Sequence, residues 1–256
     1  MGGALTYRLG LVGIGTSPGL PAPNPPFANV MWLSGFEGTD ASTTIPYEGH
    51  IAGITVTANG NAQIDTGQKK FGSSSLQLDG NGDYVSSADN NNWTPSTGGF
   101  CAEAWIRFDP GANLSLNHTI MSQYNATGGH RSWIFSYFGT AGELRFYATN
   151  NESSITLQVG YAWVPSTGVW YHVAAERSSL APGTYRLYID GAKVAKTTSG
   201  LATAIANTAA PFQVGATATP SDYFHGWIDE ARFTNGLSVY ETDGTFTVPA
   251  AAFPRS

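Results

Sequence analysis

Apolar and polar residues alternate with a period of two along most of the chain after Asn29, and turn residues separate the runs. This pattern is typical of β-strands that bury one face. The run from Phe100 to Phe108 has bulky residues at both parities, which indicates a central strand. Asn81-Gly82 and Asp190-Gly191 tolerate positive φ angles and predict hairpin turns. The pattern predicts strands at residues 30–36, 75–79, 83–86, 100–108, 118–124, 131–138, 143–149, 154–159, 169–177, 184–190, 193–197, 212–215 and 226–234.

Many short strands without helices predict a sandwich or a barrel. No break in composition divides the chain after Pro26. We therefore expect an all-β domain over residues 29–256, built as a two-sheet antiparallel jelly-roll sandwich. The segment 201–210 is rich in alanine and predicts either one helical turn or a loop.

Residues 1–28 differ from the rest and predict an extended N-terminal arm. The stretch 16–26 holds five of the 14 prolines, which fix φ and remove the backbone N–H. Before it, the apolar residues alternate with other residues, as they do in a strand that docks on a partner. These residues are Leu5, Tyr7, Leu9 and Leu11. Two interpretations follow, an anchoring arm or a flexible linker.

Composition excludes several classes of protein. The chain has a net charge of −6 and only 12% charged residues, which excludes binding of nucleic acid by bulk electrostatics. No apolar run approaches the roughly 18 residues that a membrane span requires, so we expect no membrane partner. Cys101 is the only cysteine, which excludes an intrachain disulfide and a cysteine-cluster metal site.

Several motifs together resemble those of the concanavalin A-like lectin/glucanase family, in its laminin-G-type form. The first is Gly60–Asp65 followed by Lys70–Val85. Further along, Phe100–Trp105, Gly168–Ala174, Tyr185–Gly191 and Phe224–Phe233 resemble the family's later strands in the family's order. The resemblance covers residues 29–254 and implies a concanavalin A-like jelly roll.

A narrower resemblance concerns bacteriophage proteins. Phe71–Ser73 and Phe246–Pro254 are similar to laminin-G-type domains of tailed bacteriophages. This implies a virion structural protein, either a head decoration or a tail appendage or fibre, which the arm attaches to other virion proteins. We then expect a homo-oligomer or an assembly on the particle, located in the virion. The alternative is a stand-alone carbohydrate-binding module that is extracellular or on a cell surface.

The acidic residues argue against an enzyme. Glycosidases use a pair of carboxylates that flank the scissile bond. Two carboxylates on one strand face the same side when they are two residues apart. Glu103 has no acidic partner at that spacing. Asp229 and Glu230 are adjacent, so we expect their side chains on opposite faces of the strand. We therefore expect no catalytic residues, with an orphan glycosidase as the third hypothesis. Glu103 is expected to be a structural acid that pairs with Arg232 or His172.

The family resemblance also implies calcium where the first and last strands meet. Calcium binds hard oxygen ligands, some of them backbone carbonyls. Glu37, Gly72 and Asp229 are the expected ligands, although Glu37 stands where the related pattern usually has Asp. The alternative is that Asp229 accepts hydrogen bonds from a backbone turn or pairs with an arginine.

Aromatic residues near strand ends are candidates for sugar binding, because the C–H face of a pyranose ring stacks on an exposed aromatic ring. The alternative for each is packing in the core or in a hairpin. The candidates are Trp93, Tyr124, Trp133, Trp163 and Tyr223.

Overall fold

The computed structural model describes residues 23–198, 204–218 and 222–256. These residues form fifteen β-strands and two 3₁₀ helices, Phe27–Asn29 (η1) and Asn91–Trp93 (η2). No helix within the described ranges is long and apolar enough to cross a membrane. The predicted all-β fold is confirmed.

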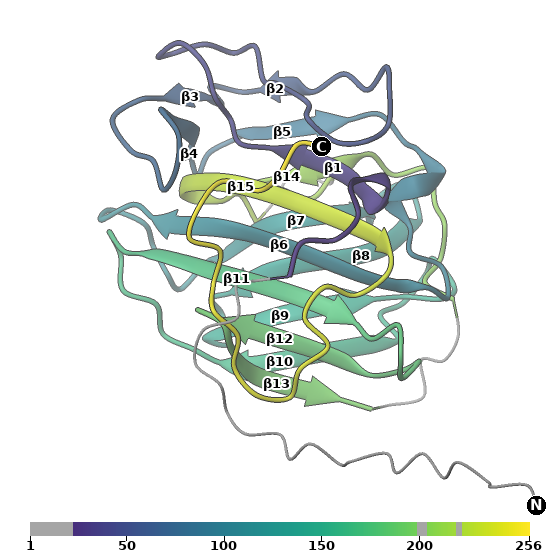
Figure 1. The fold of residues 1–256 in the computed structure, drawn as a ribbon. Helices are drawn as coiled ribbons and strands as arrows, with labels where there is room; N and C mark the ends of the chain where they lie inside the picture. The colour runs from purple at the N-terminus through teal and green to yellow at the C-terminus, as the bar shows by residue number, and fades with distance from the viewer. Residues whose placement is uncertain (1–22, 199–203, 219–221) are drawn as a thin grey trace, which may run out of the picture.

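The strands form two antiparallel sheets packed face to face as a jelly-roll sandwich (Figure 1). The eight-stranded sheet runs β13 (Ala192–Thr197), β12 (Tyr185–Ile189), β11 (Trp170–Arg177), β6 (Gly99–Phe108), β15 (His225–Gly236), β4 (Ser75–Asp79) and β3 (Gln63–Asp65), and β1 (Val30–Ser34) also pairs with β15. The seven-stranded sheet runs β10 (Leu157–Ala162), β9 (Glu143–Ala148), β8 (His130–Phe138), β7 (Asn117–Asn125), β14 (Phe212–Val214), β5 (Tyr84–Ser87) and β2 (Thr57–Asn59).

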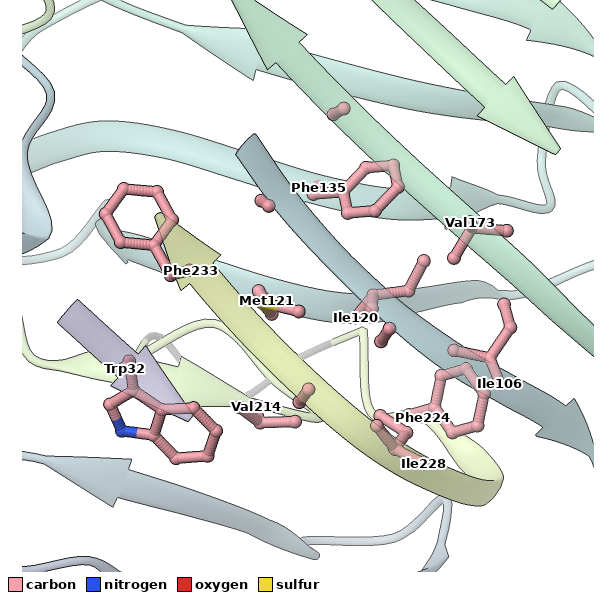
Figure 2. Packing of buried hydrophobic residues seen from close by; sticks show 14 of the residues in the cluster. Trp32, Ile106, Ile120, Met121, Phe135, Val173, Val214, Phe224, Ile228 and Phe233 are labelled. Carbon is pink, nitrogen blue, oxygen red and sulfur yellow. The ribbon is translucent and has the colours of Figure 1, made fainter. Parts of the chain in front are cut away.

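The core lies between the sheets, and in most strands residues of one parity build it. In β6, Phe100, Ile106 and Phe108 are fully buried in the main apolar cluster. Trp133 of β8 stacks on Phe233 of β15 with ring centroids 5.0 Å apart, which joins the two sheets. Figure 2 shows apolar side chains of both sheets converging between the strands. Burial of each large apolar side chain contributes about 1.5–3 kcal/mol to the stability of the fold.

A β-bulge interrupts β15 opposite β6. The register shifts between Asp229 and Arg232, and Glu230 has a φ of 51°. Such a bulge turns the strand and re-aims side chains. The Asp229 carboxylate accepts hydrogen bonds from the backbone N–H groups of residues 70–71. The Glu230 carboxylate accepts a hydrogen bond from the backbone N–H of Phe253. The expectation that adjacent positions send these two acids to opposite faces is therefore wrong, because both bind segments that cover the outer face of the eight-stranded sheet.

The other expectations from the pattern have mixed outcomes. The long predicted strands are present, with ends that shift by a few residues. The alternation does not predict β2 and β3, because three residues are too few to show a period of two. Residues 204–210 form a loop. The proposed anchoring residues Leu5, Tyr7, Leu9 and Leu11 lie outside the described residues, and the boundary at residue 28 stays a prediction.

Candidate functional site

The outer face of the eight-stranded sheet is covered by the C-terminal segment 237–256, which crosses it and returns toward β1 (Figure 1). Tyr240 and Phe246 stack on each other with ring centroids 3.7 Å apart. Both rings also contact His172 and Tyr188 of the sheet. Phe253 is 2% exposed and packs in a cluster with two residues of β1. This part of the face is therefore closed to a large ligand.

Beneath this cover, Glu103 occupies the centre of a buried polar cluster. Its carboxylate accepts hydrogen bonds from Arg232 Nε at 2.9 Å and Nη2 at 2.8 Å, and it contacts His172 Nε2 at 3.1 Å. The Tyr240 hydroxyl donates to the same carboxylate. Burial alone would raise the pKa of Glu103, but the charge of Arg232 and the hydrogen bonds of His172 and Tyr240 lower it to about 2. The prediction of a structural acid is confirmed.

A second buried acid, Glu176, holds the C-terminal segment in place. Its carboxylate accepts the backbone N–H groups of Val239, Tyr240 and Glu241, and the hydroxyl of Tyr188 donates to it at 2.7 Å. Burial raises the pKa of this carboxyl, and the hydrogen bonds lower it in part. The sequence analysis missed this role, since a lone acid in a strand carries no signal for the distant backbone that it binds.

The residues expected to bind calcium meet at the turn formed by residues 70–73. Asp229 Oδ2 accepts the N–H of Lys70 at 2.7 Å and that of Phe71 at 3.0 Å. Glu37 Oε2 accepts the N–H of Ser73 at 2.9 Å and also its hydroxyl. The structure therefore brings Glu37 and Asp229 to one turn. Both carboxylates hold its backbone there.

This donor set fits a hydrogen-bonded turn better than a calcium site. Asp229 Oδ1 is buried and makes no hydrogen bond, and burial raises the pKa of this carboxyl to about 7. It is one oxygen that a cation could use, whereas calcium takes roughly six to eight oxygen ligands. Within the described ranges no group of three or more His, Cys, Asp or Glu residues is placed to hold a metal. Calcium binding stays a prediction.

The five candidate aromatic residues separate into three environments. Trp93 and Trp133 are 0% and 1% exposed, so the prediction that they contact sugar is wrong. Their indoles fill the core, and Trp133 Nε1 donates to the carbonyl of Trp93 at 2.9 Å. Trp163 is half-buried at the end of the sandwich against Phe108 and neighbouring rings.

Tyr124 and Tyr223 remain on the surface. Tyr223 stacks on Tyr84 of β5 with ring centroids 6.4 Å apart. Tyr124 is the residue before the last one of β7, and its hydroxyl accepts a hydrogen bond from Arg131 Nε at 3.1 Å. Val85 of β5 points into the core, so the side chain of its neighbour Tyr84 points to the outer face of the seven-stranded sheet. The stacked pair of Tyr84 and Tyr223 therefore lies on that face.

Tyr124 lines a hollow of about 360 Å³ on that same outer face. Strands β7 to β10 supply its floor, and residues just before β15 supply one wall. Aromatic and aliphatic side chains dominate the lining, with a few polar groups among them. The lining residues are Tyr124, Ala126, Ile134, Phe138, Tyr147, Ile155, Gln158, Thr217 and Asp222.

The polar groups around this hollow are held by defined contacts. The Arg145 guanidinium lies 4.3 Å from the centre of the Phe138 ring, and its Nε donates to Glu143 at 2.5 Å. Arg145 also donates to the hydroxyl of Tyr147. Asp222 accepts a hydrogen bond from the Asn117 amide at 3.3 Å, and burial raises the pKa of its carboxyl. Aromatic surface with a few convergent polar groups is typical of a small-ligand site.

A larger hollow of about 470 Å³ lies beside β2. It is lined by residues 43–45, Tyr47 and residues 54–58, mostly threonine and aliphatic side chains. The hydroxyl of Tyr47, its one aromatic residue, already donates to the carbonyl of Met31. Despite its size, this hollow therefore offers less recognition chemistry than the one at Tyr124.

Sequence reasoning found Tyr124 but missed its neighbours Phe138, Tyr147 and Asp222. A usable signal exists in two of the strands. In β8 and β9 aromatic residues occur at both parities, Tyr137 beside Phe138 and Phe146 beside Tyr147. Since one parity fills the core, the other must place aromatic rings on the outer face. No such signal marks Asp222, which comes from a loop.

Comparison with known proteins identifies the family. The sequence profile of the concanavalin A-like lectin/glucanases superfamily matches residues 79–238, which is more than half of the chain. The chain therefore belongs to this superfamily. The curated proteins compared with the chain give no sequence match.

Solved structures share the fold at low sequence identity. The binding domain of Paraclostridial Mosquitocidal Protein 1 is 16% identical, with a TM-score of 0.63 over 85% of this chain and 51% of that one. The receptor binding domain of botulinum neurotoxin C/D mosaic serotype is 14% identical, with a TM-score of 0.57 over 83% of this chain and 49% of the other. The binding domain of botulinum neurotoxin serotype G is 13% identical, with a TM-score of 0.58 over 82% and 49%. The chain thus spans about half of each of these domains.

Proposed function

We propose that this chain is a glycan-binding domain without catalytic activity, and that it binds on the outer face of the seven-stranded sheet. The observation that carries the proposal is the aromatic hollow at Tyr124, Phe138 and Tyr147. The opposite sheet offers no comparable surface beneath the segment 237–256, because that segment covers it. The open face is therefore the side on which a ligand can reach strand residues.

The chemistry of the hollow suits a sugar. Aromatic rings can stack on the C–H face of a pyranose, and the exposed Gln158 amide and the Asp222 carboxylate can bind hydroxyl groups. The similar solved structures are named as binding domains of toxins, which supports a binding role over a catalytic one.

The acids near the hollow support a role without catalysis. Glu143 is paired with Arg145, and Asp222 accepts a hydrogen bond from Asn117. A glycosidase needs one carboxyl group as acid and another as base or nucleophile across the scissile bond. Turnover of a labelled glucan that is lost in an Asp222→Asn variant would contradict this part of the proposal.

Glycan binding is tested with the full chain on a glycan array, followed by calorimetry with the best ligand. We expect Tyr124→Ala and Tyr147→Ala each to weaken binding by about tenfold or more, which corresponds to roughly 1.4 kcal/mol. Phe71→Ala is the matched control, because it removes a partly exposed ring from the turn at residues 70–73, which lies beside the other sheet. Absence of any glycan ligand, or equal affinity in all three variants, would refute the proposal.

We further propose that the domain belongs to a bacteriophage particle, as a head decoration or a tail appendage, where the arm binds other virion proteins. The support is the sequence similarity of residues 71–73 and 246–254 and the proline-rich stretch 16–26. Mass spectrometry of purified particles should find the chain, and deletion of residues 1–22 should prevent its incorporation while the melting temperature is kept. A chain absent from particles that binds glycans as a monomer would favour the cell-surface or secreted module instead.

A further inference from the structure

Apart from β1, whose free side accepts hydrogen bonds from the N–H groups of Glu48 and His50, the two sheets end in four edge strands. Three of these four are protected against pairing with another chain. β2 and β3 have three residues each, and short edges pair poorly. Residues 41–42 also exchange hydrogen bonds with Ile64 of β3. β13 carries Lys193 and Lys196, and its first residues pair with the segment at Gly244 and Thr245.

The fourth edge, β10, lacks these protections. It has six residues, and no charged residue occurs from Ser153 to Gly168. Apolar side chains are exposed on the strand and in the residues that flank it: Tyr161 of β10 is 41% exposed, and the flanking Ile155 and Val164 are 39% and 84% exposed. Among the strands that the structure describes, β10 is the long edge without a charge, and such edges are templates for pairing.

The register shows which backbone groups are free. Trp163 N–H donates to the carbonyl of Gly142, and the pairing continues in register from Ala162 to Leu157. Hydrogen-bonding direction alternates along an antiparallel strand. Odd-numbered residues of β10 therefore direct their backbone groups to β9, and Gln158, Gly160 and Ala162 direct theirs away from the sheet.

We propose that β10 pairs antiparallel with β10 of a second copy of this chain, about a twofold axis at Gly160. This register places Gln158 of each copy opposite Ala162 of the other, so all three outward N–H and C=O pairs find partners. The strand suits itself as a partner because it carries no charge that would repel an identical strand. The Glu143 carboxylate of β9 packs over Gly160 at the axis, and Arg145 neutralises it through an ion pair.

The pairing would join two seven-stranded sheets into one continuous sheet. Ile155 and Gln158 also line the hollow at Tyr124, so the two hollows of the dimer would open on the same side. The proposal does not depend on what the hollow binds. One strand pair forms a small interface, so we expect an equilibrium between monomer and dimer that depends on concentration.

Sedimentation and light scattering of the full chain over a range of concentrations test the proposal. The wild-type chain should show a dimer. Replacing both Gln158 and Ala162 with Lys places like charges opposite each other and should raise the dimer dissociation constant by at least about tenfold. The control replaces Thr43 and Thr55 with Lys, because both are exposed on the same sandwich away from β10.

A charge exchange makes the test specific to the register. A second variant with Glu at positions 158 and 162 should also be monomeric, and mixing it with the Lys variant should restore a heterodimer. Circular dichroism spectra and melting curves would be used to check that both variants fold. A wild-type monomer at every concentration, a Lys variant that still dimerises, or a mixture that stays monomeric would each overturn the proposal.

Discussion

At the residue scale, the molecule depends on charges that lie away from the candidate site. Glu103 and Arg232 are 0% and 1% exposed and pair directly beneath the C-terminal segment. Removing one partner of a buried ion pair leaves the other charge buried without an opposite charge beside it. This is where single substitutions should have their largest effects.

We expect Glu103→Gln to lower the free energy of unfolding by about 3–5 kcal/mol, because Arg232 would remain buried without an opposite charge. Urea denaturation measures the change. Glu152→Gln is the control, since its contact with His130 is nearly half exposed and 3.8 Å long, and it should change stability by less than about 1 kcal/mol. Equal losses in the two variants would argue against the buried pair.

The same residue predicts a pH dependence. The pKa of Glu103 is about 2 in the folded chain, below its ordinary value of 4.5. Its stabilisation is therefore complete above about pH 4.5 and is lost as pH falls toward 2. Denaturation midpoints measured at pH 6 and pH 3 should differ more in the wild type than in Glu103→Gln. A variant as sensitive to acid as the wild type would show that other carboxyls control the effect.

At the element scale, the turn at residues 70–73 connects the first strands to the last one. Gly72 has a φ of 60°, and a Cβ there would lie 1.5 Å from Glu37 Oε1. The turn therefore requires glycine for its backbone and for the carboxylate that packs on it. The structure shows that Glu37 and Asp229 bind this turn. The sequence left two interpretations of Asp229 open, a metal ligand or an acceptor of hydrogen bonds from a backbone turn.

Gly72→Ala should destabilise the chain more than Gly82→Ala does. Gly82 also has a positive φ, but nothing lies within 4 Å of its position for a Cβ, so its replacement measures the backbone cost alone, about 1–2 kcal/mol. At Gly72 the displaced Glu37 would also lose hydrogen bonds, each contributing roughly 0.5–1.5 kcal/mol. Urea denaturation compares the two variants. Equal losses would mean that Glu37 does not hold the turn.

Calcium is tested at the same turn. A metal that binds the native state alone raises stability, by roughly 2.7 kcal/mol at a concentration of about 100 Kd. If the site exists, millimolar calcium should raise the melting temperature of a chain treated with EDTA, and Asp229→Asn should abolish the increase. Identical melting with and without calcium would leave the turn as a hydrogen-bonded structure only.

At the scale of the whole molecule, the sequence predicts the fold far better than the site. Periodicity identifies the long strands because burial of one face imposes a period of two. The position of Glu103 in a central strand also predicts a buried acid that pairs with an arginine or a histidine. Periodicity fails for Trp93 and Trp133, because a position near a turn does not show whether an indole points outward or folds into the core. It misses Asp222 and Glu176, since their partners come from distant segments whose meeting depends on sheet order.

The position of β15 has a further consequence, for synthesis and folding. This strand spans His225–Gly236, yet it lies between β6 and β4 and also pairs with β1. Val30 pairs with Thr234, so the first strand must wait for the last one. Contacts of such long sequence separation slow folding. On the ribosome, the edge of β6 that pairs with β15 stays unpaired until this final strand emerges. Early termination would release a chain without β15, whose unpaired strand edges would be prone to aggregation.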